Sequence, residues 1–505
     1  MKTSSLFRSL AAAAVVLLLA FPAAAQTADF TTFVSLGDSL TQGVLDGCVV
    51  EYGQRDAWPA VIARQAGVSS FELPLIKSHG LGPCMYLKSL TPTFGYYPND
   101  GVPLNATLAR PYNNLAVSGF NTHDVVATNP TTAAGGIAYL TLRGQGTALQ
   151  QAAALKPSFV MVWIGANDIF SAITSATTIE CPNPAVPGCT LTNMASINAD
   201  LDTIFSTLKA AQGGTAKGVA MTLANGLKIP FATTVSPILG TNPANGQPIF
   251  ALSNVGCPTS VPVCPVPPGS MLTLVAAQYL QAGYGIPCAI LSPTDPRQAN
   301  CNKPLPDNYS VNPSTGAVSP GVVLTPPEQA AILQKSIDIT AAIKTKAAAY
   351  GYKVFDMTSW FDDFVANGRS WGGLTATAAY LAGGLFSYDG AHLSSLGEAV
   401  LATDLIAFIN ANFGNSLPEP DMYRYLFNGD TSSGGYPIPP TSGLSPTPDE
   451  TLSWAAAVFG PDTWLQNLQF FFPDTSPRRS ARVSPGGEPA PDVPEVPRNE
   501  PDRVN

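Results

Sequence analysis

Short apolar runs alternate with helix-like segments along the chain, and this alternation limits the possible folds more than any other feature. Five runs are strand candidates, at residues 31–36, 112–117, 158–164, 217–223 and 352–355. The third run is apolar at nearly every position, which is typical of a strand buried on both faces. Strands separated by helices indicate a parallel sheet with helices on both sides, so we expect a three-layer α/β/α sandwich.

Helices are expected where apolar residues recur every three or four positions. One such stripe consists of Ile197, Leu201, Ile204 and Leu208. Residues 325–328 (Thr-Pro-Pro-Glu) have the form of a capping box with proline at the first helical position, and Gly351 marks the expected end of that helix. A last helix is expected to end at Gly414. In such a sheet, ligands bind beyond the carboxyl ends of the strands.

Two regions do not fit the α/β repeat. Residues from about 240 to 321 carry four of the eight cysteines and many prolines, so we interpret them as a disulfide-bonded insertion in a domain that spans 26–415. Residues 416–472 form a C-terminal extension whose aromatic residues, such as Trp454 and Trp464, are candidates for packing against the domain. Residues 473–505 are rich in Pro, Arg and Glu, and we expect them to be disordered.

The first 25 residues have the features of an export signal. Lys2 and Arg8 precede an apolar run at 10–21 that is about half a membrane span, and Ala25 ends a run of small residues. We therefore expect cleavage after Ala25, a secreted protein (periplasmic or extracellular), and no transmembrane segment in the mature chain. The alternative is an uncleaved anchor.

Charge and cysteine usage exclude some partners. The formal charge of −9 disfavours binding to a phosphate backbone, so no nucleic-acid partner is expected. The cysteines are even in number with no Cys-x-x-Cys pair, and the histidines are scattered at His79, His123 and His392, so no metal site is expected. In an oxidising compartment the cysteines are expected to form four disulfides between sequence neighbours. The alternative is several free buried thiols. Nothing in the sequence indicates an oligomeric state.

Residues suited to nucleophilic catalysis follow the expected strands. Ser39 lies in Gly-Asp-Ser-Leu after the first strand, at the start of a helix, although a serine there can also serve only as an N-cap. Gly119 follows the second strand and Asn167 the third, where a backbone N–H and a side-chain amide can donate hydrogen bonds. Asp389 and His392 lie three residues apart on one late loop, so the carboxylate can orient the imidazole.

These four blocks, in this order, resemble those of the GDSL or SGNH hydrolase superfamily, over residues 33–413 without the insertion. The resemblance implies a flavodoxin-like fold and hydrolysis of lipid, aryl or carbohydrate esters. Ser39, Gly119, Asn167 and His392 match the four residues that give the family its name. One departure is Leu393, where many relatives have proline.

The resemblance and the chemistry imply one set of roles. Ser39 is the expected nucleophile, His392 the base and Asp389 its orienter; the N–H groups of Ser39 and Gly119 and the amide of Asn167 form the expected oxyanion hole. No cofactor is required. Asp38 and Asp168 are interpreted as turn-forming or network carboxylates, and His79 and His123 as ordinary histidines.

Several alternatives stay open. Gly-Arg-Ser-Trp-Gly around Ser370 matches the nucleophile elbow of another hydrolase fold, but no apolar strand precedes it. A non-catalytic surface-binding protein would be expected to lack one of the triad residues, and none is missing. An acyltransferase would use the same serine. The apolar, aromatic loops favour a small-molecule or lipid ester as substrate, with carbohydrate O-acyl esters as the second choice.

Overall fold

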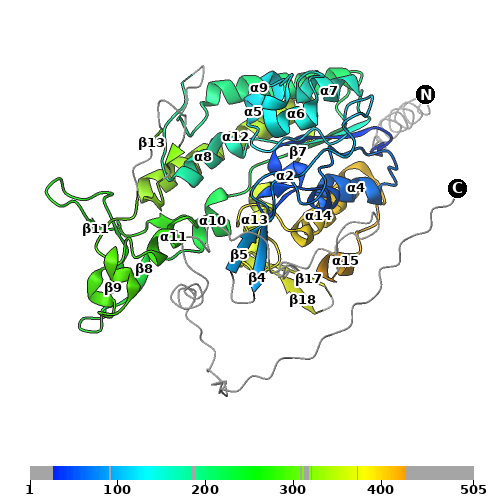
Figure 1. Cartoon of the computed structure of the whole chain (residues 1–505). Coiled ribbons are helices and arrows are strands. Elements are labelled where there is room, and N and C mark those ends of the chain that lie inside the picture. The colour runs from blue at the N-terminus through cyan, green and yellow to red at the C-terminus, as the bar shows by residue number, and fades with distance from the viewer. Residues whose placement is uncertain are drawn as a thin grey trace, which may run out of the picture.

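The computed structural model describes residues 27–89, 93–182, 188–306, 310–311, 318–319, 321–371 and 373–427 (Figure 1). The expected export signal, the aromatic residues around Trp454 and the tail 473–505 lie outside these ranges, so their predictions stay untested.

A parallel sheet of four strands forms the centre of the molecule. It consists of β1 (Phe33–Gly37), β6 (Phe159–Trp163), β7 (Gly218–Met221) and β16 (Lys353–Phe355), in the order β1-β6-β7-β16. Val34 pairs with Val160 and Phe355 with Met221, and all three strand pairs are parallel. Four of the five expected strands, and the α/β/α class, are confirmed.

Residues 112–117 do not form the regular strand that was expected. The segment nevertheless follows the free edge of β1, because the Ser35 N–H donates to Asn113 O (2.9 Å) and the Leu115 N–H to Ser35 O (3.0 Å). The side-chain amides of Asn113 and Asn114 donate to the carbonyls of Phe33 and Thr41, and such side-chain bonds compete with a regular ladder. Counting this segment, the spatial order is 2-1-3-4-5, as in flavodoxin-like folds.

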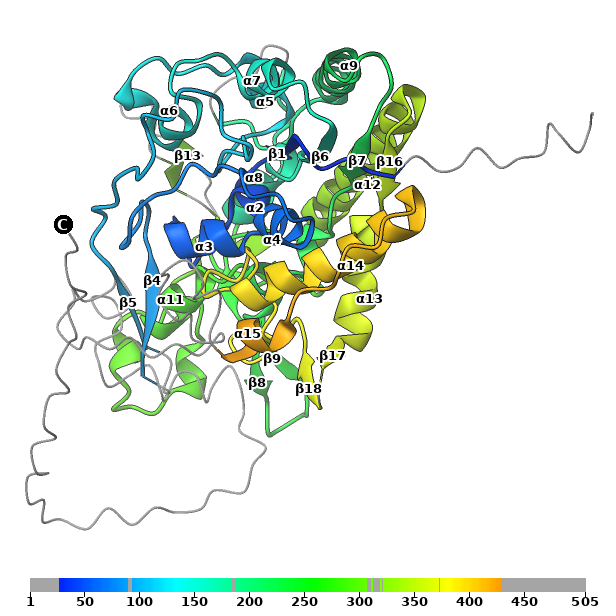
Figure 2. The ribbon, with the colours of Figure 1, turned by 90° about the vertical axis from the view of Figure 1, so that its right-hand side faces the viewer.

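Helices cover both faces of the sheet (Figure 2). One face is covered by α5 (Thr122–Ala127), α7 (Ala148–Ala154), α8 (Asn167–Ser175), α9 (Met194–Ala211) and α12 (Pro326–Tyr350). The other is covered by α4 (Trp58–Gln65), α13 (Met357–Asn367) and α14 (Ser395–Phe413).

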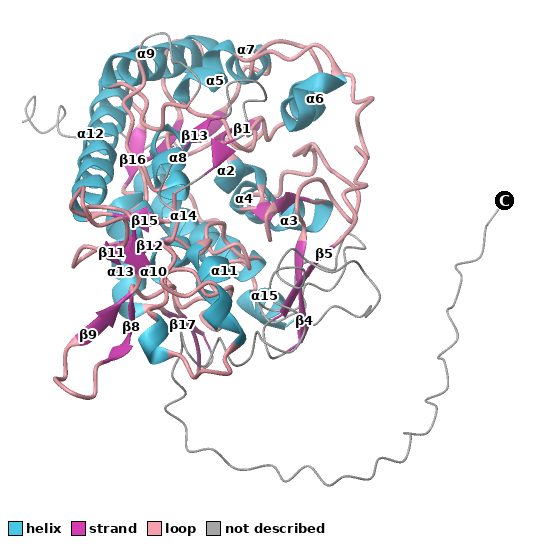
Figure 3. Ribbon diagram, turned by 60° about the vertical axis from the view of Figure 1, so that its left-hand side comes forward, coloured by secondary structure: helices cyan, strands magenta, loops and turns pink. Residues whose placement is uncertain are grey.

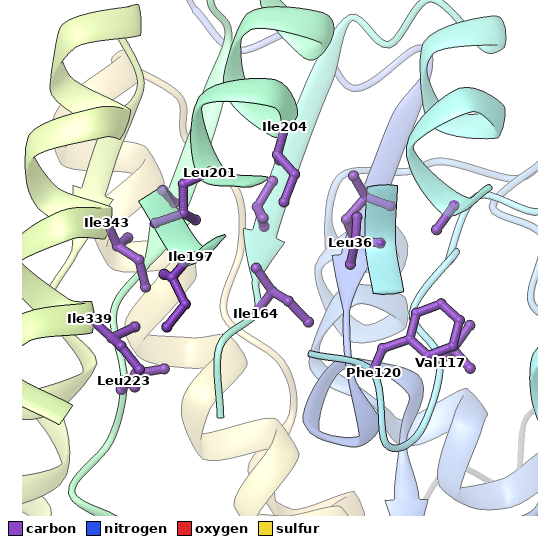
Figure 4. Close-up of a cluster of buried hydrophobic side chains, with 14 of the residues drawn as sticks. Leu36, Val117, Phe120, Ile164, Ile197, Leu201, Ile204, Leu223, Ile339 and Ile343 are labelled. Carbon is purple, nitrogen blue, oxygen red and sulfur yellow. The ribbon is translucent and has the colours of Figure 1, made fainter. Parts of the chain in front are cut away.

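Alternation along the strands distributes side chains between two cores. In β6, Val160 and Val162 face the core under α9 and α12, whereas Phe159 and Met161 face the core under α14. The stripe predicted on α9 packs into the first core, where Ile197, Leu201 and Ile204 meet side chains of the sheet and of α12 (Figure 4).

The predicted helix ends are confirmed. The Glu328 carboxylate accepts hydrogen bonds from the backbone N–H (2.8 Å) and hydroxyl (2.7 Å) of Thr325, and α12 ends at Tyr350, before Gly351. The helix α14 ends before Gly414. Among the described helices, α14 alone is long and apolar enough to cross a membrane, but 61% of its apolar window is buried inside the fold.

The insertion has a small apolar core of its own. It contains β8 (Ile238–Thr241), β9 (Pro248–Phe250), β10 (Leu252–Ser253), β11 (Cys264–Pro265), β12 (Met271–Leu272), α11 (Ala276–Gln281), the 3-10 turns η3 (Cys288–Ile290) and η4 (Pro296–Ala299), β13 (Ser310–Val311) and β14 (Val318–Ser319). Its buried cluster includes Leu272, Leu280 and Leu305, and the β8–β9 hairpin projects from the body (Figure 3). The strand β15 (Val323–Leu324) pairs with β12 and leads into α12.

All eight cysteines are paired, so the alternative of free thiols is wrong. The pairs are Cys48–Cys84, Cys181–Cys189, Cys257–Cys264 and Cys288–Cys301. Each joins neighbours in the cysteine order, as predicted, and two lie in the insertion.

Shorter elements connect these parts. They are α2 (Ser39–Gln42), β2 (Val44–Leu45), β3 (Cys48–Val49), α3 (Glu51–Asp56), β4 (Met85–Ser89), β5 (Thr93–Tyr96), η1 (Ala133–Gly135), α6 (Gly136–Leu142), η2 (Gly226–Lys228), α10 (Pro230–Thr233), β17 (Arg369–Trp371), β18 (Leu374–Ala376) and α15 (Met422–Phe427).

Candidate active site

Ser39 begins the short helix α2 directly beyond the carboxyl end of β1. The residue that caps this helix is Asp38, whose carboxylate accepts the Leu40 N–H (3.0 Å), so Ser39 is not the N-cap. The Ser39 hydroxyl is thus not needed to accept a free N–H group at the start of the helix. Ser39 is mostly buried but lines a cavity.

Gly119 and Asn167 follow the two segments that lie beside β1: Gly119 comes after residues 112–117, and Asn167 comes after β6. Gly119 has a φ of +84°, and a Cβ built on it would have no heavy atom within 4 Å, so its backbone faces open space. The neighbouring Ser118 N–H donates to Gln42 Oε1 (2.8 Å), which ties this loop to α2. Asn167 opens α8, and its Nδ2 donates to Phe120 O (2.9 Å), which fixes the amide orientation.

Asp389 and His392 form the pair that their spacing predicted. The distance from His392 Nδ1 to Asp389 Oδ2 is 2.8 Å, and Oδ1 accepts the backbone N–H groups of Ala391 and His392 (2.9 Å each). Burial alone would raise the pKa of Asp389, but the imidazole and these N–H donors hold it well below its usual range. Burial disfavours the imidazolium, yet the adjacent carboxylate raises the pKa of His392 above 6.5.

Ser39, Asn167 and His392 line one cavity of about 780 Å³, part of it open to solvent. Asp389 lies behind the ring, and Gly119 is not part of the lining. No hydrogen bond joins Ser39 to His392 within the described residues. The rest of the wall is mostly apolar and comes from the end of β6, from α8, from α13 and from two loops; it includes Trp163, Phe170, Ile173, Leu223, Met357, Trp360, Phe361 and Phe386.

Other acidic groups near the site serve the local structure. Asp168 accepts the N–H (3.0 Å) and hydroxyl (3.1 Å) of Thr122, which joins α8 to the helix after Gly119. Burial raises the pKa of Asp168 to about 6 and that of Asp38 to about 7. His79 and His123 lie outside the cavity lining and contact Asp100 and Asp200.

The alternative nucleophile Ser370 lies in the two-stranded ribbon of β17 and β18. It is exposed, its hydroxyl is 2.8 Å from Thr375 Oγ1, and it does not line the cavity. A nucleophile elbow needs a sharp strand-to-helix turn, and a strand of an antiparallel ribbon is not one.

One contact to the Asp389–His392 pair was not anticipated. The Gly47 N–H donates to Asp389 Oδ2 (2.8 Å), from the turn between β2 and β3. Asp-Gly between two apolar pairs is a hairpin signal that sequence inspection can detect, but its contact with Asp389 is not. Across the described residues, no group of three or more His, Cys, Asp or Glu side chains is placed to hold a metal.

Comparison with known proteins gives one family match. Residues 33–250 match the model of the family described as GDSL-like lipase/acylhydrolase. No curated protein matches the chain.

Several solved structures are similar at low identity. An acetyl xylan esterase of Geobacillus stearothermophilus is 11% identical, with 77% of this chain and 99% of that chain covered and a TM-score of 0.30. An extracellular lipase of Streptomyces rimosus is 16% identical (72% and 94% covered, TM-score 0.29). A lipase/acylhydrolase of Enterococcus faecalis is 11% identical (77% and 98% covered, TM-score 0.29). At these scores the likeness adds nothing to the family match.

Proposed function

We propose that this chain, whose residues 33–250 match the GDSL-like lipase/acylhydrolase model, is a carboxylic ester hydrolase that acts through an acyl-enzyme on Ser39. His392 is the general base and Asp389 orients its ring. The observation that carries this proposal is that Ser39, Asn167 and His392 line the same cavity. Behind the imidazole, Asp389 Oδ2 lies 2.8 Å from His392 Nδ1.

The reaction follows from these positions. Ser39 Oγ attacks the ester carbonyl while its proton passes to His392 Nε2, because Nδ1 is held by Asp389. The negative charge on the carbonyl oxygen is stabilised by the N–H groups of Ser39 and Gly119 and by the Asn167 amide, where one donor is worth about 10²–10³ in rate. The imidazolium then protonates the leaving alcohol. Water, activated by the same base, releases the acid.

The composition of the cavity wall supports an ester with an apolar acyl chain, as in lipids. Aromatic and aliphatic side chains from α8 and α13 dominate the wall, as is usual for sites that bind small apolar molecules. Carbohydrate O-acyl esters are the second candidate substrate. Transfer of the acyl group to another hydroxyl would need the same residues.

The proposal includes the export and organisation of the chain. Lys2, Arg8 and the apolar run before Ala25 favour export, and the four disulfides are typical of proteins outside the reducing cytosol. In this organisation the hydrolase domain spans 26–415, with the insertion at about 240–321, and is followed by the extension 416–472 and the tail 473–505.

A serine-directed phosphonate tests the nucleophile, because it mimics the tetrahedral intermediate. We expect mass spectrometry to find the adduct on Ser39, no labelling of Ser39→Ala, and normal labelling of Ser370→Ala. An adduct on Ser370 would contradict both the site and its place in the fold. No adduct at all, with no product from any ester tested, would favour a binding protein.

A panel of esters tests the substrate class. We expect kcat/KM to rise with the length of the acyl chain from acetate upward, because each buried methylene is worth about 0.8 kcal/mol. Ile173→Trp, which narrows the cavity, should lower kcat/KM for the longer chains and spare acetate. A preference for acetylated sugars over longer acyl chains would support the carbohydrate alternative.

A further inference from the structure

The strands β2 and β3 form a tight hairpin whose two-residue turn consists of Asp46 and Gly47. Both residues have positive φ, 54° and 81°. A two-residue hairpin turn with positive φ at both positions favours Asp-Gly, because aspartate tolerates this region and glycine has no Cβ. The backbone of the turn is therefore well defined by its own sequence.

This turn contacts the loop of Asp389 at three successive residues. The Asp46 N–H donates to Ser387 Oγ (3.2 Å), and Asp46 Oδ1 accepts the Tyr388 N–H (2.9 Å). The Gly47 N–H donates to Asp389 Oδ2, the same oxygen that contacts His392 Nδ1, with both distances 2.8 Å. Two donors on one oxygen fix the rotation of the carboxylate about its χ2 angle.

A disulfide holds the hairpin where it meets the loop. Cys48 directly follows Gly47 and is bonded to Cys84, and both cysteines are buried. The residue after Cys84, Met85, donates its N–H to Asp46 O (2.9 Å), so the turn is also tied to the start of β4.

We propose that the Asp46–Gly47 turn, clamped by Cys48–Cys84, is a positioning element for the Asp389 carboxylate. Asp46 touches neither the ring of His392 nor the cavity wall; it acts by holding Tyr388 and by placing the Gly47 N–H on Asp389. The inference rests on the proposed function, since it assumes that Asp389 orients the base. Loss of the turn should lower kcat and leave KM unchanged, because the walls that bind the acyl chain do not change.

Two substitutions of Asp46 separate its hydrogen bond from its charge. Burial raises the pKa of Asp46 to about 8, and asparagine has the shape of the uncharged acid. Asp46→Asn also keeps the acceptor for Tyr388 and tolerates positive φ. We expect Asp46→Ala to lower kcat about tenfold, the scale on which small misplacements act, while Asp46→Asn stays within about threefold of the parent. KM should be unchanged in both.

A second test does not depend on Asp46: it compares two variants, each of which lacks one disulfide. We expect Cys48→Ala/Cys84→Ala to lower kcat about tenfold at unchanged KM, and Cys257→Ala/Cys264→Ala, in the insertion, to change kcat by less than about twofold. Thermal unfolding shows whether each variant is folded at the assay temperature. If Cys48→Ala/Cys84→Ala fails to fold, the two Asp46 variants decide; if Asp46→Ala fails to fold, the two disulfide variants decide.

The outcomes separate this inference from the proposed function. A parental kcat in both Asp46→Ala and Cys48→Ala/Cys84→Ala, with Ser39→Ala inactive, overturns the positioning role alone. Equal losses in Asp46→Ala and Asp46→Asn, or equal losses on removal of either disulfide, also overturn it. Activity retained in Ser39→Ala overturns the proposed function.

Discussion

Two disulfide-bonded regions outside the α/β repeat are linked by hydrogen bonds to the loop 387–392, one directly and the other through Phe231. The β2–β3 hairpin reaches a side chain of the loop directly, because the Gly47 N–H donates to the Asp389 carboxylate. The insertion is linked to the loop backbone only through Phe231 of α10: Leu274 donates its N–H to Phe231 O (2.7 Å), and Phe231 donates its own to Gly390 O (2.9 Å). The hairpin therefore holds the Asp389 side chain, whereas the insertion supports the backbone of the loop.

The insertion also differs in having its own core. Leu272 and Leu305 are fully buried in a cluster separate from the two cores of the sandwich. The hairpin has no such cluster; its buried residues Val44 and Val49 form a small group with Ile76 and with side chains of α6. Because the insertion has its own core, we expect a substitution there to lower stability without displacing the loop 387–392. A substitution in the hairpin turn is expected to displace Tyr388 and Asp389, which the turn contacts directly. Substitutions in the insertion are therefore expected to change stability, and substitutions in the hairpin turn are expected to change turnover.

The largest expected effect is the loss of turnover when His392, on the loop 387–392, is replaced. His392→Ala should lower turnover by about 10⁴-fold or more, because among the described residues that line the cavity no other side chain is a base that can take the serine proton. His123→Ala is the matched control, since that ring lies outside the cavity, and it should retain parental turnover. Steady-state kinetics checks both variants. If the two histidine variants behaved alike, the loop would not carry the base and the comparison would lose its premise.

The next effect removes the charge that both His392 and Gly47 contact. Asp389→Asn should lower turnover by about 10²–10⁴-fold, because the amide no longer stabilises the imidazolium or selects the useful tautomer. The substitution also removes the largest of the effects that raise the pKa of His392, so the acid limb of the kcat/KM profile should move to lower pH. Turnover close to the parental value would mean that the hairpin holds a carboxylate without a role in the chemistry.

The insertion core is expected to affect stability only. Leu272→Ala should lower the free energy of unfolding by about 2–5 kcal/mol, as is usual when a buried leucine is truncated, and leave kcat within about twofold. Urea unfolding and steady-state kinetics on the same preparation measure the two quantities. A drop in kcat as large as that of Asp46→Ala would show that the insertion also positions the catalytic loop, and the distinction between the regions would fail.

The smallest effect concerns pH. The pKa of His392 is raised above 6.5 by Asp389, and the base must be neutral, so kcat/KM should decline as pH falls, with a midpoint above 6.5. The same pair stabilises the fold fully below the unfolded pKa of about 6.5, and this contribution is lost as pH rises through the folded pKa. Cys257→Ala/Cys264→Ala should leave the midpoint in place. A parental midpoint below 6.5 would contradict the raised pKa.

Local sequence patterns determined most of the fold and the identity of the candidate residues. The continuous apolar run of residues 158–164, the helical stripe from Ile197 to Leu208 and the Thr325–Glu328 cap each lie within one element, so a few consecutive residues suffice to encode them. Order along the chain then placed Ser39, Gly119 and Asn167 beyond strand ends. The pairing of Asp389 with His392 follows from a spacing of three residues on one loop.

Contacts between distant segments were decided only by the tertiary structure. The hairpin at Asp46–Gly47 is a local signal, yet its hydrogen bond to Asp389 spans 342 residues, and no periodicity encodes such a pairing. The segment 112–117 has the composition of a strand but departs from a regular ladder because Asn113 and Asn114 bond to carbonyls of β1 and α2. The cavity likewise combines α8 and α13, which lie on opposite faces of the sheet. Local propensity selects each element, but only the packing of all elements together determines which distant side chains meet.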